Sequence, residues 1–258
     1  MRARVRLWQL GILVLLLAGW ELSVRLGWVD AFFFSKPSEI AGRIFEWFST
    51  GEIYGHLWIT LWETMLAFLI GTLLGVVLGL WLALVPTASA VLDPFIKAMN
   101  SIPRVILAPI FTLWFGLGVA SKVALGVTLV FFVAFFNTYQ GIKEVNPVVL
   151  ANARMLGASG RQLLAHVYLP SAASWIFSSL RTSIGFAVIG AVVGEYLGSA
   201  RGLGYLISQA EGVFDTTGVF AGMVVLAVFV VLLDWVVSRV EARLLVWRPA
   251  PGQEGGTV

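Results

Sequence analysis

Long apolar stretches recur along this chain and leave no helix face for polar side chains. The longest covers residues 57–85 and holds Glu63 as its one charged side chain. An α-helix of about 20 apolar residues crosses the hydrocarbon core of a bilayer. Among the 258 residues, 12% are charged, which is about half of the share in a typical soluble domain. These features predict an all-α, polytopic membrane protein embedded in a lipid bilayer.

Six stretches are apolar enough to be interpreted as transmembrane helices of a single domain that covers residues 1–258. The first lacks a signal-peptide cleavage site and is followed by further spans, so we expect an uncleaved anchor. The third is short, follows Pro103, and has room to extend back toward Asp93 as a tilted helix. The six expected spans are residues 7–26, 57–85, 105–118, 123–139, 180–198 and 219–237.

Lysine and arginine residues are unequally distributed between the two sides that six spans define. Six crossings put both termini on one side, and cytoplasmic segments of membrane proteins are enriched in basic residues. One side carries twelve basic residues and the other carries five, which predicts cytoplasmic termini and a cytoplasmic segment 146–170. The twelve are Arg2, Arg4, Arg6, Lys97, Arg104, Lys143, Arg154, Arg161, Arg181, Arg239, Arg243 and Arg248, and the five are Arg25, Lys36, Arg43, Lys122 and Arg201.

Two of the expected spans carry glycines four residues apart, which places them on one face of a helix. Such a face lets a second helix backbone approach closely. One interpretation is ordinary packing inside a helix bundle. The other is a subunit interface, or the lining of a translocation pathway whose helices must slide. The two sets are Gly71, Gly75 and Gly79, and Gly190, Gly194 and Gly198.

Glu195 follows Gly194 near the outer end of the fifth expected span. An ionisable side chain in a span is costly and is therefore a candidate for a pathway or a gate. At this depth its carboxylate has a second interpretation, which is contact with water at the headgroups. Glu63 lies near the outer end of the second span and is ranked below Glu195. Glu21 and Arg25 lie four residues apart on a helix, so we expect them to pair.

The sequence lacks the common signatures of an enzyme. It contains no Gly-Lys dipeptide, so it has no P-loop for ATP. It has two histidines, no HExxH motif and no cysteine, which excludes thiolate metal sites. Its net charge of +3 does not indicate a nucleic-acid-binding surface. We expect neither catalysis nor a bound cofactor or metal in this chain.

One polar segment, ANARMLGASGRQLLAHVYLP, interrupts the apolar pattern between the fourth and fifth spans. Asn146 and Pro147 predict the start of a first helix, and Gly157 predicts its end. Ser159 is the expected cap of a second helix, and Pro170 is expected to limit its continuation. Residues 146–170 thus predict a helix–turn–helix that projects into the cytoplasm.

The same segment has an expected apolar side, formed by Leu156, Leu163, Leu164 and Val167. Arg154 and Arg161 are expected to face water or another protein. A short amphipathic element of this kind either receives a partner protein or lies on the inner leaflet, held there by its arginines.

The segment resembles the signature loop of the membrane subunits of bacterial ABC importers, the binding-protein-dependent permeases. That loop reads Glu-Ala-Ala, three residues, Gly, nine residues, and Ile-x-Leu-Pro. Here Ala153, Gly157, Val167, Leu169 and Pro170 keep the spacing. Ala151 and Asn152 depart from the family's Glu and Ala. The resemblance implies that ATPase-coupling contacts involve Ala151, Ala153, Arg154, Gly157, Ala158, Ser159, Arg161, Leu164 and Pro170.

Further stretches are similar to the branch of this family that handles aliphatic sulfonates, taurine, nitrate, bicarbonate and some vitamin precursors. They include PSEI, GEYLGSARGLGYLI and FDTTGVFAGM. The resemblance implies a homodimeric type I permease in a bacterial inner membrane, importing a small anion. It also implies a separate ATPase subunit that binds ATP and Mg, and an extracytoplasmic substrate-binding protein.

The coupling mechanism that we expect is a lever, in which the ATPase subunits move the helix around residues 157–164 and thereby rock the spans that it joins. Three alternatives stay open. An ion-coupled secondary carrier would transport without ATP, although the sequence shows no clear repeat between its halves. A membrane scaffold would transport nothing. An ABC importer for a vitamin precursor would share the mechanism and differ in substrate.

Overall fold

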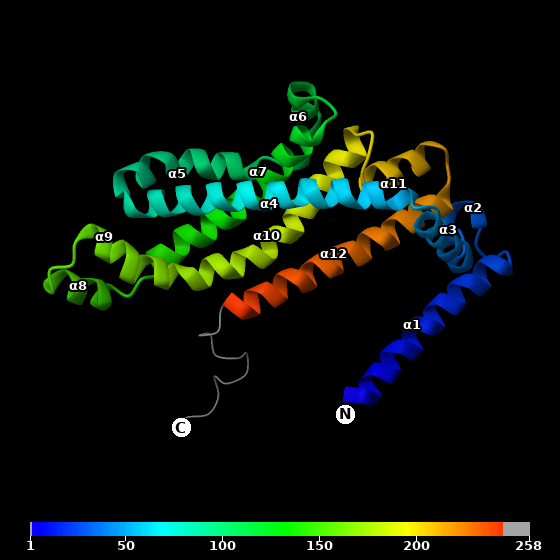
Figure 1. The fold of residues 1–258 in the computed structure, drawn as a ribbon, viewed down its shortest axis with the longest axis horizontal. Helices are drawn as coiled ribbons and strands as arrows, with labels where there is room; N and C mark the ends of the chain where they lie inside the picture. Colours follow the sequence, from blue (N-terminus) through cyan, green and yellow to red (C-terminus); the bar gives the residue numbers. More distant parts are fainter. Residues whose placement is uncertain (1, 245–258) are drawn as a thin grey trace. The chain divides into compact units, whose positions relative to one another are not determined.

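The structure is a computed structural model and describes residues 2–244. Every regular element in this range is helical, which confirms the all-α prediction (Figure 1). In chain order the elements are α1 (Arg2–Arg25), α2 (Ala31–Phe34), α3 (Pro37–Thr50), α4 (Glu52–Leu84), α5 (Pro86–Ser101), the 3₁₀ turn η1 (Arg104–Leu107), α6 (Ala108–Phe115), α7 (Val119–Lys143), α8 (Pro147–Met155), α9 (Gly160–Leu163), the π-helical turn η2 (Leu164–Tyr168), α10 (Leu169–Gly198), α11 (Leu203–Gly212) and α12 (Thr216–Leu244).

Five of the described helices, α1, α4, α7, α10 and α12, are long and apolar enough to cross a membrane. A sixth span arises if α5 and η1–α6 count together, but this pair is bent by 83°. The extension toward Asp93 is thus a separate helix, and not the continuation of one tilted helix. The break falls at Ile102, whose ψ of 126° is extended, because a residue before proline is disfavoured in the α conformation.

The chain divides into two compact units. Unit 1 comprises residues up to 67, 103–126 and 188–228, and unit 2 comprises residues 68–102, 127–187 and those from 229 onward. Helices α4, α7, α10 and α12 each contribute residues to both.

In unit 2, the first glycine set packs α4 against α7. A Cβ atom placed on Gly75 would lie 2.6 Å from the Phe131 carbonyl oxygen and 2.7 Å from the Ala134 Cβ atom. Gly71 and Gly79 meet α7 in the same way. For this set the structure shows packing within one chain, because only glycine allows so close an approach of two backbones.

In unit 1, α1 is joined to α3 through Glu21. Its carboxylate accepts hydrogen bonds from the Ser38 backbone N–H at 3.0 Å and from the Ser38 hydroxyl at 2.9 Å. It also pairs with Arg25 at 2.7 Å, as the four-residue spacing predicted. A carboxylate at the start of α3 satisfies a backbone N–H that the helix itself leaves unpaired.

Candidate functional site

The polar segment 146–170 lies in unit 2 and runs from beyond the end of α7 to the first two residues of α10 (Figure 1). The Asn146 side chain caps α8 by accepting a hydrogen bond from the Val148 N–H at 2.9 Å. Gly157 follows α8 with a φ of +80°, a left-handed conformation that favours glycine. Ser159 then opens α9 with a capping box that it forms with Gln162. The predicted helix–turn–helix is therefore confirmed.

The expectation that Pro170 limits the second helix is wrong. Pro170 is the second residue of α10, which continues to Gly198. Residues Leu164–Tyr168 form a π-helical turn directly before it, and the Leu169 N–H donates to the Leu164 carbonyl. A wider turn removes the strict i to i−4 pairing that a proline disrupts, so the chain passes through Pro170 without a break.

The expected apolar side of this segment divides into two. Leu163 and Val167 are buried, whereas Leu156 is 88% exposed. Arg154 and Arg161 are exposed, as expected, and so are Ala151 and Ser159. Ala153, Ala158 and Leu164 are partly buried. A shallow depression of about 400 Å³ is lined by Ala153, Leu156, Gly157, Ala158, Gln162, His166 and Val167.

A second concentration of polar groups lies in unit 1, where three ionisable side chains are almost fully buried. Glu63 on α4 and Glu195 on α10 are each 1% exposed, and Lys122 on α7 is 0% exposed. All three lie in unit 1, and the buried Glu63 Oε2 atom has no hydrogen-bond partner among the described residues. Buried charges of this kind are costly unless they are paired.

Glu195 also binds the backbone where α11 begins. Its Oε1 atom accepts a hydrogen bond from the Thr60 hydroxyl at 2.6 Å, and its Oε2 atom accepts one from the Gly204 N–H at 2.8 Å. The Leu203 N–H donates to the Thr60 hydroxyl oxygen at 2.9 Å. The residue before them, Gly202, has a φ of +114°. One carboxylate thus holds α4, α10 and the first turn of α11 together.

The Lys122 ammonium group donates to the carbonyl oxygens of Leu117 and Gly118, the latter at 3.1 Å. Its aliphatic stem lies on Gly194, where an added Cβ atom would meet the Lys122 Cγ atom at 2.9 Å. Gly198 packs on Thr112 and Leu117, and Gly190 is buried in α10. The second glycine set therefore also makes contacts within the chain.

Reasoning from sequence selected Glu195 but underrated Glu63 and assigned no role to Lys122. The residues are far apart in the sequence, and only the fold shows that all three are buried in unit 1. The available signal was their type, because an ionisable residue within or beside an apolar span is a candidate site by default.

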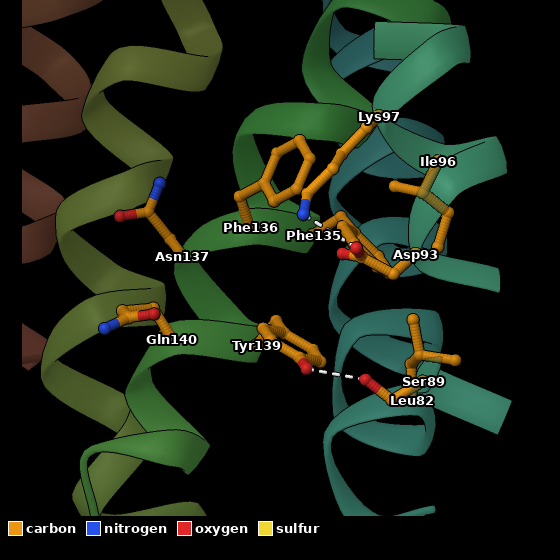
Figure 2. A pocket seen from close by; sticks show the side chains of 10 residues that line it. All are labelled: Leu82, Ser89, Asp93, Ile96, Lys97, Phe135, Phe136, Asn137, Tyr139 and Gln140. Atoms are coloured by element: carbon orange, nitrogen blue, oxygen red, sulfur yellow. Dashed lines mark hydrogen bonds and ion pairs between the residues drawn. The ribbon is translucent and has the colours of Figure 1, made fainter. Parts of the chain in front are cut away.

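Unit 2 holds a cavity of about 410 Å³ between α5 and α7 (Figure 2). Lys97 and Asp93 form an ion pair of 2.6 Å at its edge. The hydroxyl groups of Ser89 and Tyr139 form a hydrogen bond of 2.6 Å. The cavity thus combines one cation, one carboxylate and neutral hydrogen-bonding groups, together with apolar side chains, including the buried Phe135.

The fold resembles solved ABC importers. The chain aligns with a chain of the inward-facing methionine ABC transporter MetNI with a TM-score of 0.61 at 20% identity, covering 73% of this chain and 94% of the other. It aligns with an amino acid ABC transporter with a TM-score of 0.59 at 21% identity, covering 78% and 95%. At these identities the likeness concerns the fold.

Sequence relatives cover nearly the whole chain. A Bacillus subtilis permease named for aliphatic sulfonates transport is 35% identical over 93% of this chain and 88% of its own length. The riboflavin transport system permease protein of Chloroflexus aurantiacus is 36% identical over 91% and 88%. The taurine transport system permease protein of Escherichia coli is 30% identical over 93% and 89%. The family model of the binding-protein-dependent transport system inner membrane component matches residues 71–246, and the chain belongs to that family of ABC importer permeases.

Proposed function

We propose that this ABC importer permease works with separate ATPase subunits that dock on segment 146–170. The observation that carries the proposal is the exposure of Leu156, which stands at the left-handed turn made by Gly157. Met155 beside it is also exposed, and Arg154 and Arg161 flank the turn. Large apolar side chains grouped on a polar surface mark a protein contact.

ATP and Mg are bound by the docked subunit in this proposal. Segment 146–170 connects α7 to α10, so a subunit bound to this segment can act on both helices. Closure of the ATPase subunits would push the α8–α9 pair, and the π-helical turn before α10 would pass the movement to that helix. A coupling of this kind requires that the partner contacts the segment differently in its two states.

The substrate that we propose is a small anion, such as an aliphatic sulfonate, taurine or nitrate. The names of the Bacillus subtilis and Escherichia coli relatives support a sulfonate. The cavity in unit 2 supports a small solute, with Lys97, which pairs with Asp93, as the cation that an anionic group would meet. A vitamin precursor is the second candidate, and the riboflavin permease of Chloroflexus aurantiacus favours it.

The proposed assembly contains two copies of this chain in a bacterial inner membrane, with both termini in the cytoplasm. An extracytoplasmic substrate-binding protein delivers the solute at the opposite face. The proposed pathway or gate involves the end of α10, with Gly190, Gly194, Glu195 and Gly198. Glu195 is buried, and its burial supports the view that the end of α10 moves as a rigid element of this gate.

The experiment that tests ATPase docking compares two matched substitutions of exposed aliphatic residues. Leu156→Asp places a charge in the proposed contact, and Val213→Asp, at a side chain 71% exposed in unit 1, does so elsewhere. We expect Leu156→Asp to reduce co-purification of the ATPase subunit about tenfold or more, since a hot-spot residue contributes about 2 kcal/mol. Val213→Asp should retain the subunit. Full retention by Leu156→Asp would refute the docking site.

A further inference from the structure

The cavity in unit 2 lies beside a broken span. Helices α5 and η1–α6 qualify together as one candidate span, yet they are bent by 83° at the break that follows Ser101. Lys97 lies one turn before this break. Backbone that leaves the helical form at membrane depth is tolerated where it lines a cavity in the protein, and broken helices of this kind form solute sites in transporters. The break therefore marks the cavity between α5 and α7 as a candidate site for the transported solute (Figure 2).

Asp93 and Lys97 are the charged side chains of α5, and both line the cavity. The Lys97 Nζ atom donates to the Asp93 Oδ2 atom at 2.6 Å, and the two side chains are 69% and 52% exposed. On a water-exposed helix such a pair would be ordinary. In a span, ionisable side chains face the bundle interior or a water-filled cavity, because lipid does not solvate them. The pair is therefore directed at an aqueous space and not at hydrocarbon.

The other side chains that line the cavity are uncharged, and their hydrogen-bonding groups already have partners within the protein. Ser89 and Tyr139 share a hydrogen bond of 2.6 Å. The Asn137 amide group donates to a backbone carbonyl oxygen one turn earlier, and the Gln140 amide group donates to Glu144. The ion pair is thus the strongest recognition element of the cavity, because hydrogen bonds to charged groups are stronger than those between neutral ones.

The opposite signs of the pair decide which solute the cavity fits. A simple anion bound to Lys97 would lie beside the Asp93 carboxylate, and like charges brought together at a binding site are unfavourable. A small zwitterion avoids this cost, because its anionic group pairs with Lys97 while its ammonium group pairs with Asp93. The site then stays neutral, and every charge in it has a partner.

The size and the lining of the cavity allow such a ligand. A volume of about 410 Å³ falls in the range of small-molecule sites. Lysine has a flexible four-carbon stem, so Lys97 can turn away from Asp93 and admit a ligand between the two charges. Ile96, Phe135 and Phe136 supply apolar surface for a short hydrocarbon linker.

We propose that the cavity between α5 and α7 binds a small zwitterion, in which Lys97 holds a sulfonate group and Asp93 holds an ammonium group. An amino sulfonate is then preferred over a simple alkanesulfonate of the same size. The inference rests on the proposed function and deepens it by dividing the selection of the solute between two residues. Lys97 selects the anionic group, and Asp93 selects the second charge.

The test compares two solutes of matched size, taurine and propane-1-sulfonate, in which a methyl group replaces the ammonium group. Saturation-transfer NMR titrations with the purified permease in lipid nanodiscs give a Kd for each, and they need neither the ATPase subunit nor the binding protein. We expect the unchanged permease to bind taurine about tenfold more tightly, because the ammonium group forms a charge-assisted hydrogen bond. Asp93→Asn should weaken taurine binding about tenfold and strengthen propane-1-sulfonate binding, since it releases the Lys97 ammonium group.

Two further variants supply the controls. Lys97→Met should weaken the binding of both solutes, because both present a sulfonate group. Glu39→Gln removes the acid of an exposed ion pair in unit 1, in which Lys36 lies 2.8 Å from Glu39. Both Kd values should stay unchanged in this variant.

Equal binding of the two solutes by the unchanged permease, or binding of neither, overturns the proposal. So does an Asp93→Asn variant that weakens both solutes alike or leaves taurine binding unchanged. If Asp93→Asn cannot be purified, the unchanged permease decides, and a preference for taurine of about tenfold supports the proposal. Failure of the proposed function is seen separately. A complete importer that takes up neither solute would refute the proposed substrate, and failure of ATPase docking would appear in the Leu156→Asp experiment.

Discussion

The Thr60 hydroxyl group donates a 2.6 Å hydrogen bond to Glu195 although 135 residues separate the two in the chain. The same oxygen accepts from the Leu203 N–H, so one small side chain connects α4, α10 and α11. Each of these polar groups is buried, and each finds its partner in another. A buried network in which every member is satisfied is rigid, and removal of one member leaves the others unpaired.

Glu195→Gln should therefore destabilise the protein without changing its shape. An amide offers one oxygen acceptor where the carboxylate offers two, and both oxygens of Glu195 are used. We expect a loss of about 1–3 kcal/mol in the free energy of unfolding, because a buried partner is left without its bond. Thermal unfolding in detergent measures this loss.

The matched control is Glu211→Gln, which alters an exposed carboxylate that accepts from Tyr196 in the same unit. Its unfolding temperature should stay close to that of the unchanged protein, because exposed groups recover their hydrogen bonds from water. Equal effects of the two substitutions would show that burial of Glu195 contributes nothing to stability.

Gly204→Ala is expected to be more disruptive than its size suggests. The added Cβ atom would lie 2.3 Å from the Val192 carbonyl oxygen and 2.9 Å from the Glu195 Cβ atom. The first α11 turn would have to move away from α10, at a cost of about 2 kcal/mol, since overpacking of a rigid contact forces the backbone to shift. Gly212→Ala, at the other end of α11, meets no atom within 4 Å and should be tolerated. Comparable unfolding temperatures for the two variants would contradict the contact.

Features that depend on local sequence were predictable. The apolar stretches located the long helices, because burying backbone in lipid requires helices of about 20 residues. Asn146, Gly157 and Ser159 gave the ends of α8 and α9, since caps act within one turn. The prediction for Pro170 failed because a rule for single helices does not include a compensating π-helical turn.

Long-range partners were not predictable in the same way. Lys122 was counted as a basic residue of the outer side, yet it is fully buried in the structure. Hydrophobic periodicity predicts the helix face on which a residue lies. It does not predict which residue of another helix packs against that face. The glycine spacing likewise predicted a close helix contact, while the identity of α7 as the partner of Gly71, Gly75 and Gly79 required the fold.

Lys97→Met tests whether the cavity in unit 2 lies on the path of an anionic solute. Lys97 is its cation and now pairs with Asp93 at 2.6 Å. Loss of one charge-assisted hydrogen bond to the solute should raise the KM for uptake of an aliphatic sulfonate about fivefold, equivalent to about 1 kcal/mol. Asp93→Asn should have the opposite effect, because it frees the ammonium group. Uptake assays in vesicles that contain the complete importer give both values.

Lys36→Met is the matched control for Lys97→Met. Lys36 also pairs with a carboxylate on a nearby residue of the sequence, Glu39, but it lies in unit 1. Its KM should remain that of the unchanged importer. If Lys97→Met and Lys36→Met behave alike, the solute does not contact Lys97, and the cavity loses its part in the proposed path.

Two glycines of α4 provide a test of the close contact between α4 and α7. A Cβ atom on Gly75 would meet the Phe131 carbonyl oxygen at 2.6 Å, whereas one on Gly55 would meet nothing within 4 Å. Gly75→Ala should therefore destabilise the protein by about 1–3 kcal/mol, because the helices must separate. Gly55→Ala should be neutral or stabilise it by up to about 1 kcal/mol, since alanine favours a helix more than glycine does. Thermal unfolding of both variants in the same detergent would distinguish these effects. A loss in Gly55→Ala as large as that in Gly75→Ala would mean that glycine is needed along α4 for a reason other than its contact with α7.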